Sequence, residues 1–209
     1  DPTVFTSEMV QKMKDGVDGW GNTNWYDKIY GTGTRTHHNI SATGGSDRVR
    51  FFASIGYLDE KGNIDNYGYN RLNLRSNIDA KLTKSLTFTL GVSGRIEKRD
   101  SPRYSANPDD WHNVPQQVIR ALPYVPDTYE YDGKTYNVST PTASSPVAPL
   151  ASINESGYSK SNYSYIQSNF SLKYDAPWLK GLSFKFQGAY DLTYNFSKIL
   201  SNPYEVMIM

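Results

Sequence analysis

The sequence predicts an all-β fold, an antiparallel meander of long strands that forms part of a transmembrane β-barrel, with one long extracellular loop containing a short helix. Three observations lead to this prediction. Apolar and polar residues alternate with period two, the alternating runs are long, and tight turns on one side contrast with long connections on the other. Because side chains alternate across a strand, each run has an apolar and a polar face and separates an apolar medium from a water-rich space.

The clearest alternation lies in residues 71–82. One face carries apolar or small residues and the other carries charged or amide residues: Leu72, Leu74, Ser76, Ile78, Ala80 and Leu82 against Arg71, Asn73, Arg75, Asn77, Asp79 and Lys81. Similar runs cover residues 49–58, 86–97 and 182–197. Each is about as long as the 9 to 11 residues that a tilted strand needs to cross a bilayer, whereas a globular strand usually has about 5 or 6. Length therefore favours a membrane sheet over the core sheet of a soluble sandwich.

Local signals place the elements in order along the chain. Residues 6–15 read as a short helix with a hydroxyl N-cap, ended by Gly16. The expected strands cover about 36–43, 48–58, 68–82, 86–98, 162–174 and 182–197. The chain then divides into a helix with an aromatic and Gly-rich lead-in (1–35), four strands (36–98), a long extracellular loop (99–161), and two strands with the start of the next loop (162–209).

The alternation also predicts which side chains share a face. Neighbouring strands joined by short turns pair, so the apolar residues are expected on one side of a meander in sequence order: Leu72, Leu74, Ile78, Phe88, Leu90, Val92, Phe184 and Phe186. An Arg at the lipid-facing midplane costs about 2 to 4 kcal/mol. The charged residues are therefore expected to face the lumen and to pair across strands or with a plug inside the barrel: Arg71, Arg75, Asp79, Arg95 and Glu97.

Composition narrows the function classes. The mean hydropathy of −0.63 and the lack of a long apolar run exclude a transmembrane helix, but a barrel strand dilutes its apolar half with a polar half. A net charge of +1 without a basic stripe argues against a nucleic-acid partner, and the absence of cysteine excludes a disulfide framework. The 17 tyrosines suit membrane interfaces and ligand-binding loops.

The chain opens at Asp1 without a signal peptide and stops at Met209 just past a strand, and its strands are too few for even a barrel of about 8. A piece of a longer protein is therefore expected.

Four groups of residues occur in a specific order and spacing between positions 24 and 98. They are Asn24-Trp25-Tyr26-Asp27 with Gly31-Thr32-Gly33, the run from His38 to Gly45, the run from Arg50 to Gly62, and the run from Tyr69 to Arg75. This pattern resembles the SusC/RagA-like TonB-dependent outer-membrane transporters. The resemblance implies a 22-stranded barrel in the bacterial outer membrane, plugged by an N-terminal domain and energised by TonB through a region outside this sequence. It also implies a SusD-like surface lipoprotein as partner, and import of a glycan or peptide.

No catalytic residue, cofactor or metal site is predicted. Asp109, Asp110 and His112 flank a helix expected at about 114–122, where acids stabilise the helix dipole and the Asn107 to Asp110 stretch serves as cap. His37 and His38 are neighbours on a strand and point to opposite faces, so they cannot share a metal.

The loop expected at 99–161 is too long for a simple connector, because structureless loops above about 12 to 15 residues are usually functional or disordered. Its aromatic residues are candidates for contact with a partner or a ligand: Tyr104, Trp111, Tyr124, Tyr129, Tyr131 and Tyr136. We expect this loop to contact the surface lipoprotein, with direct ligand contact as the lesser role. A disordered surface loop is the alternative.

A second function class stays open at this point. In a soluble all-β carbohydrate-binding or adhesion module, the apolar faces pack as a sandwich core and the loop aromatics stack on sugars. Partitioning between buffer and detergent distinguishes this module from a partial importer barrel.

Overall fold

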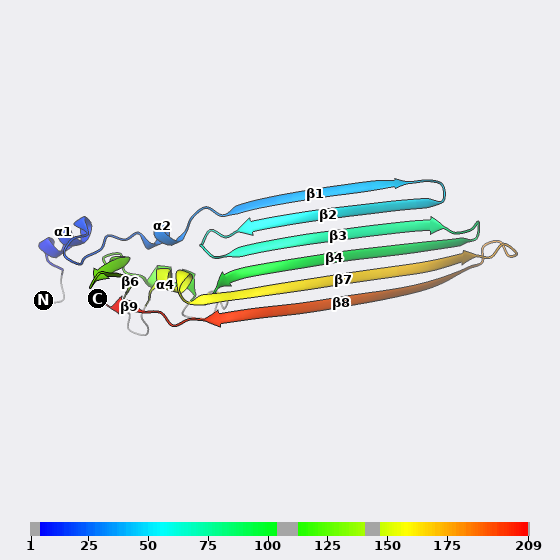
Figure 1. Ribbon diagram of the computed structural model, residues 1–209. Helices are drawn as coiled ribbons and strands as arrows, with labels where there is room; N and C mark the ends of the chain where they lie inside the picture. Colours follow the sequence, from blue (N-terminus) through cyan, green and yellow to red (C-terminus); the bar gives the residue numbers. More distant parts are fainter. Residues whose placement is uncertain (1–4, 104–112, 141–146, 209) are drawn as a thin grey trace.

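The computed structural model describes residues 5–103, 113–140 and 147–208. Six long strands lie side by side in one antiparallel sheet of order β1-β2-β3-β4-β7-β8 (Figure 1). Their bounds are β1 Thr34–Gly45, β2 Val49–Lys61, β3 Gly68–Lys81, β4 Leu86–Pro102, β7 Gly157–Asp175 and β8 Ser183–Ser201. The predicted meander of long strands is confirmed.

The register confirms the predicted faces. In an antiparallel ladder, directly opposed residues lie on the same face. Ile78 opposes Leu90, and Phe88 opposes Leu172, which in turn opposes Phe186. All eight apolar residues predicted to share a side do so, because no bulge shifts any of the ladders.

The strands reach further than the sequence pattern indicated. β4 continues to Pro102 and β7 begins at Gly157, so the connection between them spans 103–156 instead of 99–161. In these extensions the formerly apolar face turns polar, with Asp100 and Lys160, so the alternation is lost. Backbone pairing continues because it does not depend on an apolar face.

Turns and loops separate to opposite ends of the sheet (Figure 1). The turns 46–48, 82–85 and 176–182 define the turn end. The other end, the helical end, holds the loop 62–67, the described parts of the connection 103–156 and the lead-in before β1. The long connection lies at one end, as predicted, but the 176–182 turn is longer than the 62–67 loop, so the asymmetry is only partial.

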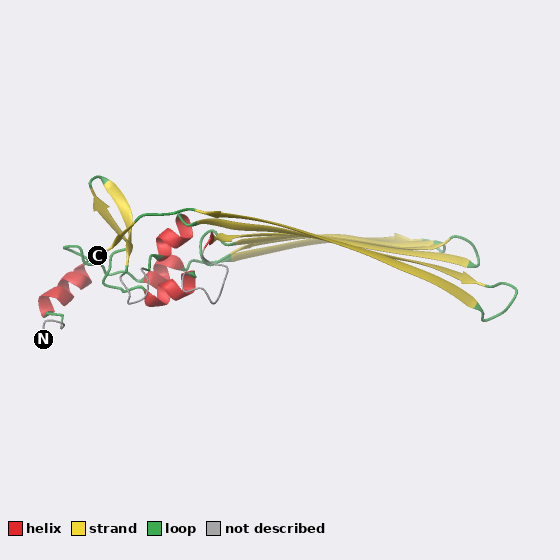
Figure 2. Ribbon diagram, turned by 90° about the horizontal axis from the view of Figure 1, so that it is seen from below, coloured by secondary structure: helices red, strands yellow, loops and turns green. Residues whose placement is uncertain are grey.

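In the described residues, the helical end contains four helices and a small sheet that lie beyond the strand ends (Figure 2). The helices are α1 Ser7–Asp15, α2 Trp25–Ile29, α3 Val114–Arg120 and α4 Pro149–Asn154, and the sheet is formed by β5 Thr128–Tyr131, β6 Lys134–Ser139 and β9 Val206–Ile208. β5 and β6 form a hairpin, and β9 pairs with β6 in parallel. No helix in the described part of the chain is both long and apolar enough to cross a membrane.

Two helix predictions have different outcomes. α1 is confirmed: the Thr6 hydroxyl accepts from the Met9 amide, and Gly16 ends the helix with φ 64°. For α3 the predicted cap is wrong. Its N-cap is Asn113, whose side chain accepts from the Gln116 amide, and the predicted cap at 107–110 lies outside the described residues. A Pro near a helix start marks the first turn, and here that residue is Pro115.

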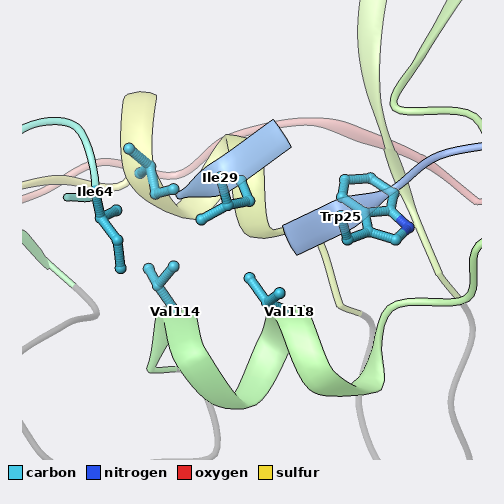
Figure 3. Packing of buried hydrophobic residues seen from close by; sticks show 6 residues of the cluster. Trp25, Ile29, Ile64, Val114 and Val118 are labelled. Carbon is cyan, nitrogen blue, oxygen red and sulfur yellow. The ribbon is translucent and has the colours of Figure 1, made fainter. Parts of the chain in front are cut away.

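The main apolar cluster lies at the helical end, because a single sheet buries neither of its faces within this segment. Figure 3 shows this cluster, the loop core, which joins the lead-in, the 62–67 loop and the long connection. Its members are Trp25, Ile29, Ile64, Val114, Val118 and Ile153. Segments far apart in sequence thus give the long connection its order.

We predict that Val114→Asp loosens the long connection, whereas Ile119→Asp does not. Val114 is 0% exposed in the loop core and Ile119 is 80% exposed on the same helix. A buried unpaired carboxylate costs several kcal/mol, so proteolytic cleavage within 103–156 should accelerate roughly tenfold or more. Limited proteolysis of the folded protein with mapping of the cut sites measures this, and equal cleavage of the two variants contradicts the assignment of the core.

Candidate functional site

The two faces of the six-stranded sheet have opposite chemistry. On the apolar face, the ladders align one residue from each strand into rows. One row consists of Ile40, Ile55, Leu74, Gly94, Ile166 and Leu192, and another of Gly44, Phe51, Ile78, Leu90, Phe170 and Gly188. Ile40 is 73% exposed and Phe186 is 63% exposed. An exposed apolar surface of this extent marks contact with a membrane or another protein.

The height of the apolar face matches a bilayer. Apolar rows run from Leu86 to Ile96 on β4, which is roughly 33 Å at about 3.3 Å per residue. A strand tilt of about 40° reduces this to roughly 25 Å, the height of the apolar band of outer-membrane barrels. At the turn end the rings of Tyr174 and Trp178 lie 5.9 Å apart. Aromatic side chains at this level are typical of a membrane interface.

The polar face carries a compact charged cluster on β4. Glu97 is only 5% exposed, and its two carboxylate oxygens bind Arg95 Nε at 3.0 Å and Arg99 Nη2 at 3.2 Å. The Arg95 guanidinium lies 4.3 Å from the centre of the Tyr165 ring on β7, and Arg99 lies 5.3 Å from that of Tyr163. Each arginine therefore combines an ion pair along β4 with a cation–π contact across strands.

The predicted polar residues share this face, but they are not all brought together. Arg95 and Glu97 form an ion pair that runs along one strand and not across two. Their lumen orientation and contact with a plug stay predictions. Arg71 lies directly opposite Glu97, but the carboxylate is held by the two β4 arginines. The other two predicted residues lie further along the face: Arg75 opposite Ser93 and Asp79 opposite Thr89.

Three residues of this cluster were not predicted: Arg99, Tyr163 and Tyr165. Period-two parity along the predicted strand 162–174 already places Tyr163 and Tyr165 on one face, and Arg99 joins the polar face once β4 is known to extend past residue 98. Between Arg75 and Arg95 the face is hollowed into a cavity of about 320 Å³, also lined by Asn73, Tyr165 and Gln167. Two guanidinium groups, two amides and a phenol suit hydrogen-bonding to a polar or anionic group.

The candidate aromatic residues of the long connection fall into three groups. Tyr129, Tyr131 and Tyr136 lie on one face of the β5–β6 hairpin, because Tyr129 opposes Tyr136 in the ladder. Tyr131 is 63% exposed, and Lys134 Nζ lies 4.5 Å from the centre of the Tyr136 ring. We call this surface the tyrosine hairpin.

The other candidates do not join it. Tyr124 packs instead against Phe5 and Trp20, with ring centres 5.5 and 6.1 Å away. Tyr104 and Trp111 lie outside the described residues.

Backbone pairing fixes the long connection to the lead-in. The Gly21 and Thr23 amides donate to the carbonyls of Tyr124 and Pro123, both at 2.8 Å. Trp25 Nε1 donates to the Leu122 carbonyl at 2.9 Å. Leu122, predicted as the last residue of a helix, therefore lies beyond its end. The tyrosine hairpin is thus attached to an ordered base.

Two ion pairs strengthen this attachment. Lys28 Nζ lies 2.5 Å from Asp127 Oδ2. Partial burial by itself raises the pKa of the Asp127 carboxyl, but the hydrogen bond and charge of Lys28 outweigh it and the pKa lies below its ordinary value. At the hairpin, Lys134 binds Glu205 at 2.8 Å, and this hydrogen bond raises the pKa of the lysine and lowers that of the glutamate.

A buried polar network joins α3, α4 and the C-terminal segment. Gln117 is 3% exposed, and its side-chain amide donates to Ser152 Oγ at 2.9 Å and accepts from the Ala148 amide at 3.2 Å. The Ser152 hydroxyl also lies 3.2 Å from the Tyr204 hydroxyl. Satisfied networks of this kind hold helices in one arrangement.

Nothing in the described ranges is arranged as a metal site. No group of three or more His, Cys, Asp or Glu side chains in residues 5–103, 113–140 and 147–208 is placed to hold an ion. His37 and His38 pair with Leu58 and Tyr57 and belong to opposite faces of β1. Asp109, Asp110 and His112 lie outside the described residues.

Comparison with known proteins agrees with this architecture. No protein-family model matches the chain. It is 29% identical over 142 residues to TonB-dependent receptor P3 of Formosa agariphila, which covers 67% of this chain and 14% of the relative. It is 32% identical over 60 residues to TonB-dependent receptor SusC of Bacteroides thetaiotaomicron, which covers 29% of this chain and 6% of SusC. The chain thus spans a small part of the length of these relatives.

Solved structures cover nearly the whole chain. The RagAB peptide transporter aligns with 97% of this chain and 25% of its own, with a TM-score of 0.66 and 20% identity. The same importer in its closed-closed state gives a TM-score of 0.67. The amphipathic sheet, the membrane-sized apolar face and these likenesses agree. The chain is similar in sequence to parts of TonB-dependent receptors, SusC among them, and it has the fold of a segment of the RagAB β-barrel.

Proposed function

We propose that this segment forms part of the barrel wall of an outer-membrane nutrient importer, with its apolar face toward lipid and its polar face toward the lumen. The observation that supports this is the continuity of the apolar rows over roughly 25 Å on one face only. Arg71, Arg75, Asp79, Arg95 and Glu97 then line the solute path or contact a plug inside the barrel. The imported solute is a glycan or a peptide; RagAB, a structural neighbour, is a peptide importer.

We further propose that the helical end is extracellular and contacts a SusD-like surface lipoprotein, while TonB engages a region of the whole transporter outside this segment. The tyrosine hairpin supports this, because it presents exposed tyrosines on an ordered base, and Tyr is enriched at protein interfaces. Direct contact between these tyrosines and the solute is the lesser role.

The alternative, a soluble carbohydrate-binding module, requires a second layer over the apolar face. Within the described residues the face has no such layer: Ile40, Phe186 and Tyr190 are all largely exposed. The module should be monomeric in buffer without detergent, whereas the barrel wall requires detergent or lipid to cover its apolar rows.

The two faces are tested by placing the same residue on each. Ile78→Arg places a guanidinium near the middle of the apolar rows. Asn77→Arg places it at the neighbouring position of the same strand, on the polar face. We expect Ile78→Arg to destabilise the inserted barrel by about 2 to 4 kcal/mol and to reduce the folded transporter in the outer membrane, with Asn77→Arg close to wild type. The measurement is the folded fraction in outer-membrane extracts of cells expressing the full-length transporter. Equal losses contradict the assignment of the faces.

The role of the tyrosine hairpin is tested on its two faces. The double substitution Tyr129→Ser with Tyr131→Ser should weaken co-purification of the surface lipoprotein roughly tenfold and slow solute uptake, because it removes exposed aromatic contact area. Glu130→Ser with Thr135→Ser changes the opposite face of the same hairpin and serves as the control.

Surface labelling of both variants serves as the control for normal insertion. Unchanged recovery of the lipoprotein with the tyrosine variant would overturn the proposed contact.

A further inference from the structure

Near the helical end, the rows of apolar side chains on the apolar face give way to rows with polar and charged side chains. The last apolar row contains Tyr57, Leu72, Ile96 and Tyr194. The next two rows hold Asp59, Asn70, Lys98, Asn162 and Phe196, then Lys61, Gly68, Asp100, Lys160 and Lys198. Positive charge therefore collects on the same side of the sheet as the apolar band, directly beyond its edge.

This collection of lysines occurs at one end only. At the turn end, the strand lysines Lys81, Lys173 and Lys185 have the opposite parity and belong to the polar face. The apolar side there ends in the row Leu86, Tyr174 and Phe184. Among the strand residues that the structure describes, every lysine of the apolar side thus lies at the helical end. Such asymmetry is expected where the two leaflets present different headgroups.

Lys160 and Lys198 form the centre of this basic edge. They are directly opposed on β7 and β8, an arrangement that destabilises a sheet when the charges are alike. Both ammonium groups lie over one ring, at 5.0 and 5.7 Å from the centre of Tyr158. In the described ranges neither takes part in an ion pair. The π face and the carboxylate of Asp100, which opposes Lys160 on β4, offset part of the repulsion, and a bound anion would offset the rest.

A hollow lies beside the lysines and gives a ligand room. Its volume is about 710 Å³, and its lining includes Lys61, Tyr158, Lys160 and Asn154, together with the carboxylates of Asp65 and Asp100. Ammonium, amide and phenol groups are donors suited to phosphate oxygens and sugar hydroxyls. A phosphorylated sugar headgroup fits this set.

The depth of the site matches lipid headgroups. Lys98 lies one row beyond Ile96, and Lys160 lies one row further. With the same rise and tilt, these rows stand roughly 5 and 10 Å above the apolar band. The headgroup layer occupies about 5 to 7 Å on each side of a hydrocarbon core of about 30 Å, and flexible lysine side chains can reach back into it.

We propose that Lys98, Lys160 and Lys198, with Tyr158, bind the phosphate group of an outer-leaflet membrane lipid. This inference rests on the proposed orientation, with the apolar face toward lipid and the helical end outside. It adds a lipid site to the barrel wall, separate from the solute path and from the tyrosine hairpin. Bound lipid would neutralise the opposed lysines and anchor the outer edge of the sheet.

The test compares two opposed lysine pairs on the same two strands. Lys160→Gln with Lys198→Gln removes the proposed site, and Lys173→Gln with Lys185→Gln removes the opposed pair on the polar face. The full-length transporter is purified in mild detergent, and phosphorylated lipid bound per transporter is measured by native mass spectrometry. We expect roughly a tenfold loss or more for the first variant and retention for the second, because each lysine near an anionic surface contributes to binding.

Two further arms identify the ligand. The wild-type transporter should bind the phosphorylated outer-leaflet lipid when that lipid is supplied in mixed micelles. It should not bind the dephosphorylated lipid supplied in the same way. Inorganic phosphate at millimolar concentration should not displace the lipid. Full displacement by free phosphate, or equal lipid retention by the two variants, would overturn the proposal.

Orientation is tested separately on the same protein. Tyr131→Cys places a thiol on the tyrosine hairpin, and a membrane-impermeant maleimide should label it on intact cells. Absence of labelling under conditions that label permeabilised cells would overturn the proposed orientation. Normal labelling combined with undiminished lipid retention by Lys160→Gln with Lys198→Gln would overturn the lipid site alone.

Discussion

The requirement that every backbone N–H and C=O within the apolar band be hydrogen-bonded governs this segment, because lipid offers no partner. The six strands meet it by pairing without a bulge over their full length. A continuous ladder keeps side-chain parity constant from β1 to β8, so one face remains apolar and the other polar. The edge strands β1 and β8 each leave one side unpaired within this sheet. Closure into a barrel satisfies them.

A one-layer wall has a second consequence, for the long connection. In the proposed barrel wall one face of the sheet contacts lipid and the other faces the lumen, so the connection between β4 and β7 packs on neither. It is ordered instead by the loop core beyond the strand ends, where Trp25 of the lead-in packs with Val118 of α3 and Ile153 of α4. The Trp25 indole N–H also bonds the Leu122 carbonyl, so the same residue provides packing and a hydrogen bond.

The alternation of side chains along β4 also places charged residues on both faces of the sheet, where they have different roles. On β4, Arg95, Glu97 and Arg99 lie on the polar face, where the carboxylate is shared by two guanidinium groups that contact tyrosines. Lys98 lies between them in sequence and points to the other side, at the edge of the apolar band. A shift of one residue in register would exchange these roles and place arginine in lipid. This accounts for the strictness of the ladder across the whole sheet.

The sequence by itself determined the two faces, the order of the strands and α1, because these follow from local periodicity and capping. Leu74 and Arg75 lie on the faces that their alternation predicts, and Thr6 and Gly16 bound the helix that they signal. Side chains alternate between the two faces of any extended strand, whatever packs against it.

Only the tertiary structure decided what depends on partners distant in the chain. The extensions of β4 and β7 past residues 99 and 161 are fixed by their ladder, and β9 forms only because β6 lies beside it. Tyr124 looked like part of a binding surface, but packing against Phe5 and Trp20 gives it a structural role. The common depth of Lys98, Lys160 and Lys198 likewise follows from register across three strands. Local sequence carries no signal for such contacts, since residues more than a hundred positions apart meet only when the chain has folded.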